Sequence, residues 1–283
     1  MLFIIGIIVV FGSVGWGFVL SHGQLAALWQ PFEILIIMGA AAGAYLIANP
    51  LRLIRESAKL MPQVVFGSKV DKSMCLDLLA LIHDILNKSR REGMMAIELD
   101  VENPNSSAIF ARYPNILSNQ PLALFIADYF RIITSGNLAS HELEALMDQE
   151  IEARFHELEQ PANALSKVAD ALPGFGIVAA VLGIVITMGS IGGDPAIIGK
   201  HVAAALVGTF MGVLFSYGLV GPISIRMKKI AEDEIKLYDA AKASIVASMN
   251  GLAPQLAIEF GRKSLFTHGR PTFDEVDSKV RNR

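Results

Sequence analysis

The residues able to do acid–base, nucleophilic or metal chemistry are dispersed along this chain. None of its six histidines pairs with another at the spacing of zinc ligands on one helix face. Cys75 is the single cysteine, so an internal disulfide is excluded and a buried apolar role is expected. Gly193 to Lys200 faintly suggests a phosphate-binding loop, but five residues rather than four separate its glycines, and His201 replaces the required Ser or Thr. These residues predict no enzyme active site, no metal site and no cofactor.

Glu33 is the only acidic residue in the four apolar stretches of the chain, which makes it the one candidate there for proton transfer. It lies at the outer end of its stretch, where a carboxylate can reach water. We therefore favour a solvated helix end over a proton relay for this residue.

Small residues recur at helical spacing within the apolar stretches, and helices in lipid associate closely through such faces. Thr209 lies beside one of these faces. Its hydroxyl has two options, which are to bond its own backbone or to face water, and the residues alone favour the backbone. The small residues are Gly39 and Gly43, then Gly176, Ala180 and Gly183, and finally Ala204, Gly208 and Gly212.

Two prolines lie in the last two apolar stretches, Pro173 near the start of the third and Pro222 near the end of the fourth. A proline lacks the N–H of a helical residue and clashes with the preceding turn unless it lies in the first turn. Pro173 fits a first-turn position. Pro222 does not, because its stretch is already several turns long, so we expect a kink or hinge there.

The elements that carry these residues are long and apolar. The chain is 53% hydrophobic and 18% charged, with a mean hydropathy of +0.47. About 20 apolar residues cross a bilayer as a helix. Four stretches meet that length: Met1–Leu20, Phe32–Ala48, Ala171–Gly193 and Val202–Ile225.

Basic residues distinguish the two sides of the predicted membrane. The loops 21–31 and 193–201 hold a single Lys, Lys200, whereas basic residues follow the second and fourth stretches directly. The positive-inside rule therefore predicts that both termini and residues 51–168 and 227–283 are cytoplasmic. The basic residues are Arg52, Arg55 and Lys59, and Arg226, Lys228 and Lys229.

The predicted fold is all-α, a polytopic membrane protein with four transmembrane helices and a large helical cytoplasmic domain. We assign residues 1–50 to transmembrane helices 1 and 2, and 51–168 to the cytoplasmic domain. Residues 169–226 form helices 3 and 4, and 227–283 a C-terminal cytoplasmic helix and tail. A net charge of −3 gives no electrostatic case for binding nucleic acid.

In the cytoplasmic segment, helical spacing of apolar residues precedes Gly93, a residue typical of a helix end. A further helix is predicted from Ser140 to Glu159, resuming after Pro161. Arg90 and Glu98 flank Gly93, and the residues alone favour an ordinary solvated face for such charges.

Several motifs, in this order and spacing, resemble the A subunits of bacterial flagellar stators, the motility protein A family, which is related to the MotA/TolQ/ExbB proton channel superfamily. The similarity covers essentially the whole chain. The motifs are Glu98-Leu99-Asp100 with Asn103-Pro104, Glu144-Ala145-Leu146-Met147-Asp148, Leu172-Pro173-Gly174-Phe175-Gly176, Val207-Gly208-Thr209-Phe210, Gly221-Pro222 and Glu259-Phe260-Gly261-Arg262-Lys263.

The resemblance implies a pentamer in the bacterial inner membrane, arranged around the paired helices of a stator B subunit (motility protein B). That partner would carry the ion-binding aspartate. Ion flow would turn the A ring and drive the FliG-type rotor switch protein of the C-ring. By resemblance, Pro173 and Pro222 couple ion movement to conformational change, Thr209 faces the ion path, and the rotor contact uses Arg90 and Glu98.

The resemblance also bears on the ion. Sodium-type relatives carry a threonine where this chain has Ala180, and a methyl group offers no oxygen ligand to sodium. We therefore expect H⁺ rather than Na⁺ as the transported ion. Two other functions remain open, an ExbB/TolQ-like proton-channel subunit that energises outer-membrane transport and a structural membrane scaffold without ion flux. The four spans and the surroundings of Arg90 and Glu98 argue against the first.

Overall fold

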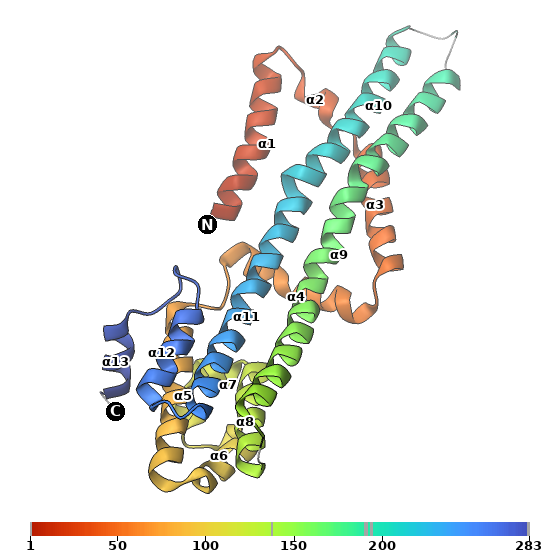
Figure 1. Cartoon of the computed structure of the whole chain (residues 1–283). Coiled ribbons are helices and arrows are strands. Elements are labelled where there is room, and N and C mark those ends of the chain that lie inside the picture. Colours follow the sequence, from red (N-terminus) through yellow and green to blue (C-terminus); the bar gives the residue numbers. More distant parts are fainter. Residues whose placement is uncertain (1, 137, 190–191, 193–194, 282–283) are drawn as a thin grey trace. The chain divides into compact units, whose positions relative to one another are not determined.

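The computed structural model describes residues 2–136, 138–189, 192 and 195–281, and these residues contain helices but no strand. Figure 1 shows the helices in chain order. The chain forms two compact units. One comprises Met1–Gly67 and Leu158–Ile230, and the other comprises Ser68–Glu157 and Ala231–Arg283.

The first unit begins with two of the predicted membrane helices. Helix α1 spans Leu2–Leu20, and α3 spans Pro31–Ala48 after the short helix α2, Leu25–Leu28. Pro31 occupies the first turn of α3, where its missing N–H costs nothing. Helix α4, Leu51–Phe66, follows Pro50 and is tied to α3 by a 2.7 Å hydrogen bond from the Tyr45 hydroxyl to Ser57 Oγ.

Helix α9, Ser140–Gly189, is one continuous helix of 50 residues (Figure 1). The predicted interruption between Glu159 and Pro161 is therefore wrong, and so is the first-turn position predicted for Pro173. Both prolines lie inside the helix. A proline removes only one helical hydrogen bond, and neighbouring helices can supply other donors to the carbonyl that it leaves free.

The last apolar stretch is likewise continuous. Helix α10, Pro195–Phe215, passes through a π-helical segment, Ser216–Val220, into α11, Gly221–Met249. Residues 195–201, predicted to be loop, are thus helical. Gly193 and the outer turn next to it lie outside the described residues. Among the described residues, four helices are long and apolar enough to cross a membrane, as predicted.

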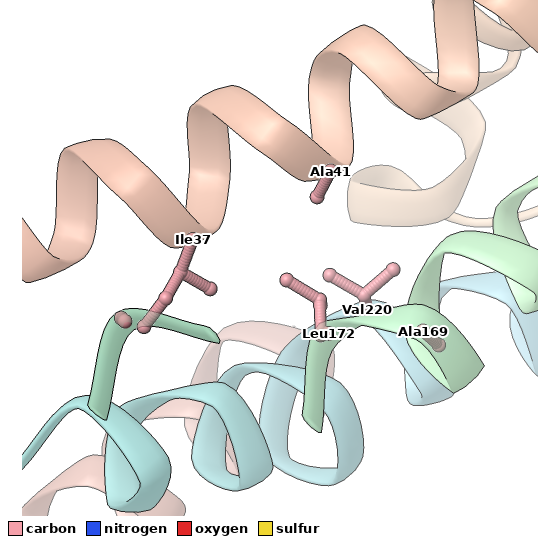
Figure 2. Packing of buried hydrophobic residues seen from close by; sticks show 6 residues of the cluster. Ile37, Ala41, Ala169, Leu172 and Val220 are labelled. Atoms are coloured by element: carbon pink, nitrogen blue, oxygen red, sulfur yellow. The ribbon is translucent and has the colours of Figure 1, made fainter. Parts of the chain in front are cut away.

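The core of the first unit joins α3, α9 and the π segment. Figure 2 shows Ile37 and Ala41 of α3 facing Leu172 of α9 and Val220 of the π segment. Ile37 and Leu172 are fully buried. A second apolar cluster, centred on Val64 of α4 and Met227 of α11, lies further along the same unit.

The second unit packs short helices around α5, Lys72–Glu92. Asp71 begins α5 by accepting a 2.7 Å hydrogen bond from the Met74 N–H, and Gly93, at φ 91°, ends it as predicted. The other elements are three 3-10 turns (Met94–Ile97, Pro104–Ser106 and Phe110–Arg112), α6 (Glu98–Glu102), α7 (Pro114–Ser118), α8 (Gln120–Ser135), α12 (Pro254–Ser264), α13 (Phe273–Arg281), and parts of α9 and α11.

Aromatic packing holds the core of the second unit. The Phe125 ring lies edge-on to Tyr129 at 4.8 Å and to Tyr238 at 5.0 Å, measured between ring centroids. Burial raises the pKa of Tyr238 to about 12.

The two compact units do not test the assigned boundaries between membrane and cytoplasmic segments. Unit 1 includes α4, which the sequence assigns to the cytoplasmic domain, because the division into units depends on compactness and not on the membrane. The four assigned segments therefore stay predictions.

Candidate ion path and cytoplasmic contact surface

The candidate ion path begins with a seam where α9 and α10 touch through their backbones. A Cβ atom built on Gly212 would lie 2.7 Å from the carbonyl oxygen of Leu172 and 2.8 Å from the Cα of Gly176. One built on Gly176 would lie 3.0 Å from the carbonyl oxygen of Gly208. Only glycine permits this approach, so the predicted small faces of the third and fourth membrane helices do meet.

Ala180 and Thr209 lie on opposite sides of this seam, and both are partly exposed. A Cβ atom on Gly208 would lie 3.4 Å from the Ala180 nitrogen, and one on Gly176 would lie 3.3 Å from the Thr209 Cα. The structure therefore brings the two residues to the same stretch of the α9–α10 contact. Their sequence separation gives no sign of this proximity.

The Thr209 hydroxyl of α10 differs in its hydrogen bonding from the hydroxyl of Thr187 in α9. Thr187 donates a 2.8 Å hydrogen bond to the Gly183 carbonyl, which is the backbone bond predicted for Thr209. Among the described residues no such bond is found for Thr209. The local preference for backbone bonding is thus not realised at this residue, and its hydroxyl remains available at the seam.

Pro173 lies one residue from Leu172, whose carbonyl forms part of the seam. The carbonyl four residues before Pro173 belongs to Ala169, and it accepts a 2.6 Å hydrogen bond from the buried hydroxyl of Ser216. The sequence interpretation missed Ser216. A serine in an apolar stretch was its only signal, and no sequence spacing connects residues 169 and 216.

Pro222 is exposed and follows the π segment after one intervening residue, Gly221. The N–H of Gly221 donates to the carbonyl of Ser216, five residues earlier, instead of four. The structure thus has a π segment, with one extra residue in the turn before the proline, and the kink or hinge at Pro222 stays a prediction. The helix continues beyond it to Met249.

Glu33 lies in the first turn of α3. Its Oε2 atom is buried and has no hydrogen-bond partner among the described residues. This carboxylate is thus less solvated than the sequence suggests. Its predicted position at a helix end is confirmed.

In the second unit, Arg90 and Glu98 lie on either side of the turn after α5. Arg90 is exposed and Glu98 partly so, and neither forms an ion pair with any residue that the structure describes. Leu99 beside them is 80% exposed and Met95 is 68% exposed. Unpaired charges around exposed apolar side chains are typical of a protein contact surface.

The two charged residues next to that pair have a different role, which the sequence interpretation missed. The Lys88 ammonium lies 2.7 Å from an Asp100 carboxylate oxygen, and the other carboxylate oxygen of Asp100 accepts a 2.6 Å hydrogen bond from Ser107. Asp100 is 8% exposed. This ion pair fixes the end of α5 against α6, and so holds Arg90 and Glu98 in place.

A second carboxylate braces the same helix. Asp84 of α5 accepts a 2.8 Å hydrogen bond from the Tyr113 hydroxyl and lies 3.5 Å from the Arg112 guanidinium. Burial alone would raise the pKa of Asp84, but neighbouring His83 and Tyr113 outweigh it and lower that pKa. The charged carboxylate is therefore the stable form that holds the 110–113 turn on α5.

Two protein families match the sequence. Motility protein A N-terminal matches residues 4–93, and the MotA/TolQ/ExbB proton channel family matches residues 117–240. The chain is 44% identical over 281 residues to motility protein A of Salmonella typhimurium, covering 99% of this chain and 95% of the relative. It is 38% identical over 273 residues to chemotaxis protein LafT of Vibrio parahaemolyticus, covering 96% of each.

The fold is similar to that of solved structures, among them the following two. The C. jejuni MotAB structure matches with a TM-score of 0.76 at 18% identity, covering 95% of this chain and 98% of that one. The flagellar MotAB stator complex from Bacillus subtilis matches with a TM-score of 0.71 at 23% identity, covering 97% of both chains. At these identities the likeness concerns the fold.

Proposed function

The chain belongs to the motility protein A family, and from that membership we propose that it is the A subunit of a bacterial flagellar stator, which converts ion flow across the membrane into torque on the rotor. The observation that carries this proposal is the glycine seam between α9 and α10, with Ala180 and Thr209 beside it. A seam with no bulky side chains allows two helices to slide or turn with little steric cost.

The ion-binding acid is expected from a partner subunit. Glu33 is the only acid in the predicted spans and lies at a helix end, so this chain offers no carboxylate next to Thr209. The two solved structures named above are of MotAB, and the one from Bacillus subtilis is a stator complex. We therefore propose that a stator B subunit inserts into a homo-oligomer of this chain, a pentamer by family resemblance, and supplies the aspartate.

The proposed transported ion is the proton. Sodium needs several oxygen ligands, and Ala180 presents a methyl group where a hydroxyl would be required. The proton channel family that matches residues 117–240 supports this choice. One elementary charge crossing 100 mV supplies about 2.3 kcal/mol. Protonation of the partner's aspartate would shift the equilibrium between two arrangements of the helices, to the extent that the proton binds more tightly in one arrangement than in the other.

The proposed rotor contact is the surface formed by Arg90, Met95, Glu98 and Leu99. Its charges have no partner within the described chain, which leaves them free for opposite charges on a rotor switch protein of the FliG type. The positive-inside rule supports a cytoplasmic position for this surface and for both termini.

Pro173→Ala tests the proposal, because it restores an N–H and removes the steric constraint in the third span. In cells that lack their own A subunit, we expect loss of swimming with normal filament assembly and a normal amount of the variant in the membrane. Unimpaired swimming would contradict the proposed coupling. Swimming speed against external sodium, with and without a protonophore, tests the ion: proton drive predicts no sodium dependence and loss of swimming with the protonophore.

A further inference from the structure

We propose that Ser216 is a positioning residue that links the two proline sites, Pro173 and Pro222, and this inference rests on the proposed function in ion-driven rotation. In an α-helix each N–H donates to the carbonyl four residues earlier. Pro173 has no N–H, so the carbonyl of Ala169 lacks its helical donor. The Ser216 hydroxyl lies 2.6 Å from that oxygen and takes the place of the missing N–H.

The backbone of the same residue belongs to the other proline site. Ser216 is the first residue of the π segment, and its carbonyl accepts the N–H of Gly221, directly before Pro222. One residue therefore contacts the irregular turn of α9 through its side chain and forms the irregular turn before Pro222 through its main chain. A change in either turn must displace Ser216 or break one of its two hydrogen bonds.

The surroundings make this hydrogen bond costly to break. Ser216 is 1% exposed and Ala169 is 4% exposed. Figure 2 shows Ala169, Leu172 and Val220 close together in the apolar cluster that also includes Ile37. Water cannot easily replace the hydroxyl in such surroundings, so the Ala169 carbonyl would be left unsatisfied.

The chain provides a matched control at Ser224. Its hydroxyl donates a 2.9 Å hydrogen bond from α11 to the Ala162 carbonyl of α9, and the residue is 6% exposed. Four residues after Ala162 stands Ser166, which has an N–H. The Ala162 carbonyl therefore keeps its helical donor when Ser224 is replaced, whereas the Ala169 carbonyl has none without Ser216.

A double-mutant cycle tests the link on the purified full chain. Ser216→Ala is measured alone and with Pro173→Ala, which returns an N–H to the Ala169 carbonyl. We expect Ser216→Ala to lower the folded-to-unfolded ratio roughly 3- to 10-fold in the wild-type background and less in the Pro173→Ala background. Ser224→Ala should have the same effect in both backgrounds. An equal effect of Ser216→Ala in both would overturn the proposal.

Swimming speed distinguishes a positioning role of Ser216 from a role in stability alone. At equal amounts in the membrane, Ser216→Ala should slow swimming, Ser216→Thr should restore part of the speed because it keeps a hydroxyl, and Ser224→Ala should swim at wild-type speed. Wild-type speed for Ser216→Ala would overturn the positioning role even if the stability cycle shows coupling. Failure of the wild-type chain to support motility would instead contradict the stator function, and the stability cycle does not depend on that result.

Discussion

Replacing Gly212 with alanine tests whether the α9–α10 seam depends on backbone contact. The added methyl would lie 2.8 Å from the Cα of Gly176, whereas carbon atoms prefer about 3.5 Å, so the helices would have to separate by roughly 0.7 Å. Overpacking of this kind costs about 1–3 kcal/mol. Alanine also favours the helix over glycine by about 1 kcal/mol, which offsets part of that cost.

Gly174→Ala is the control, because a methyl there meets nothing within 4 Å while the gain in helix propensity is the same. Thermal unfolding of the purified full chain in detergent, followed by far-ultraviolet circular dichroism, compares the two variants. We expect Gly212→Ala to be less stable than Gly174→Ala by about 1–3 kcal/mol. Equal stability of the two variants would refute the backbone contact.

Three further predictions concern the second unit. Arg90→Glu should weaken torque, with partial rescue by a charge reversal on the rotor protein; if no rotor reversal restores swimming, the pairing is wrong. Asp100→Asn should destabilise the chain by about 1–3 kcal/mol, because it removes the charge that Lys88 pairs with. The control is Asp128→Asn, which removes an exposed ion pair with Arg131 and should cost under about 1 kcal/mol in the same unfolding assay. Hydrogen bonds from Lys72 and from the Thr272 N–H lower the pKa of Glu275 from 4.5 to about 2, so their contribution is complete above pH 4.5 and is lost as the pH falls towards 2. The amide hydrogen-exchange rates of α13, corrected for intrinsic rates, should rise in the wild type as the pH falls from 4.5 towards 2. In the Glu275→Gln variant the corrected rates should not change with pH over that range.

The sequence alone determined the features that depend on local composition. Apolar length predicted α1 and α3 almost to the residue, because a bilayer core requires about 20 apolar residues whatever surrounds them. Gly93 predicted the end of α5, because glycine tolerates a positive φ. The order of the motifs predicted the family, and the small faces at Gly176 and Gly208 predicted a close helix contact, since only small residues permit one.

Only the tertiary structure decided how the prolines are accommodated. From local rules, Pro161 should interrupt α9 and Pro173 should start a helix, yet the helix continues through both. At Pro173 the missing donor to the Ala169 carbonyl is replaced by the hydroxyl of Ser216 in the π segment, which no rule about neighbouring residues can anticipate. The partners of Asp100 and the proximity of Ala180 to Thr209 are likewise fixed by packing, because they join segments that local sequence does not relate.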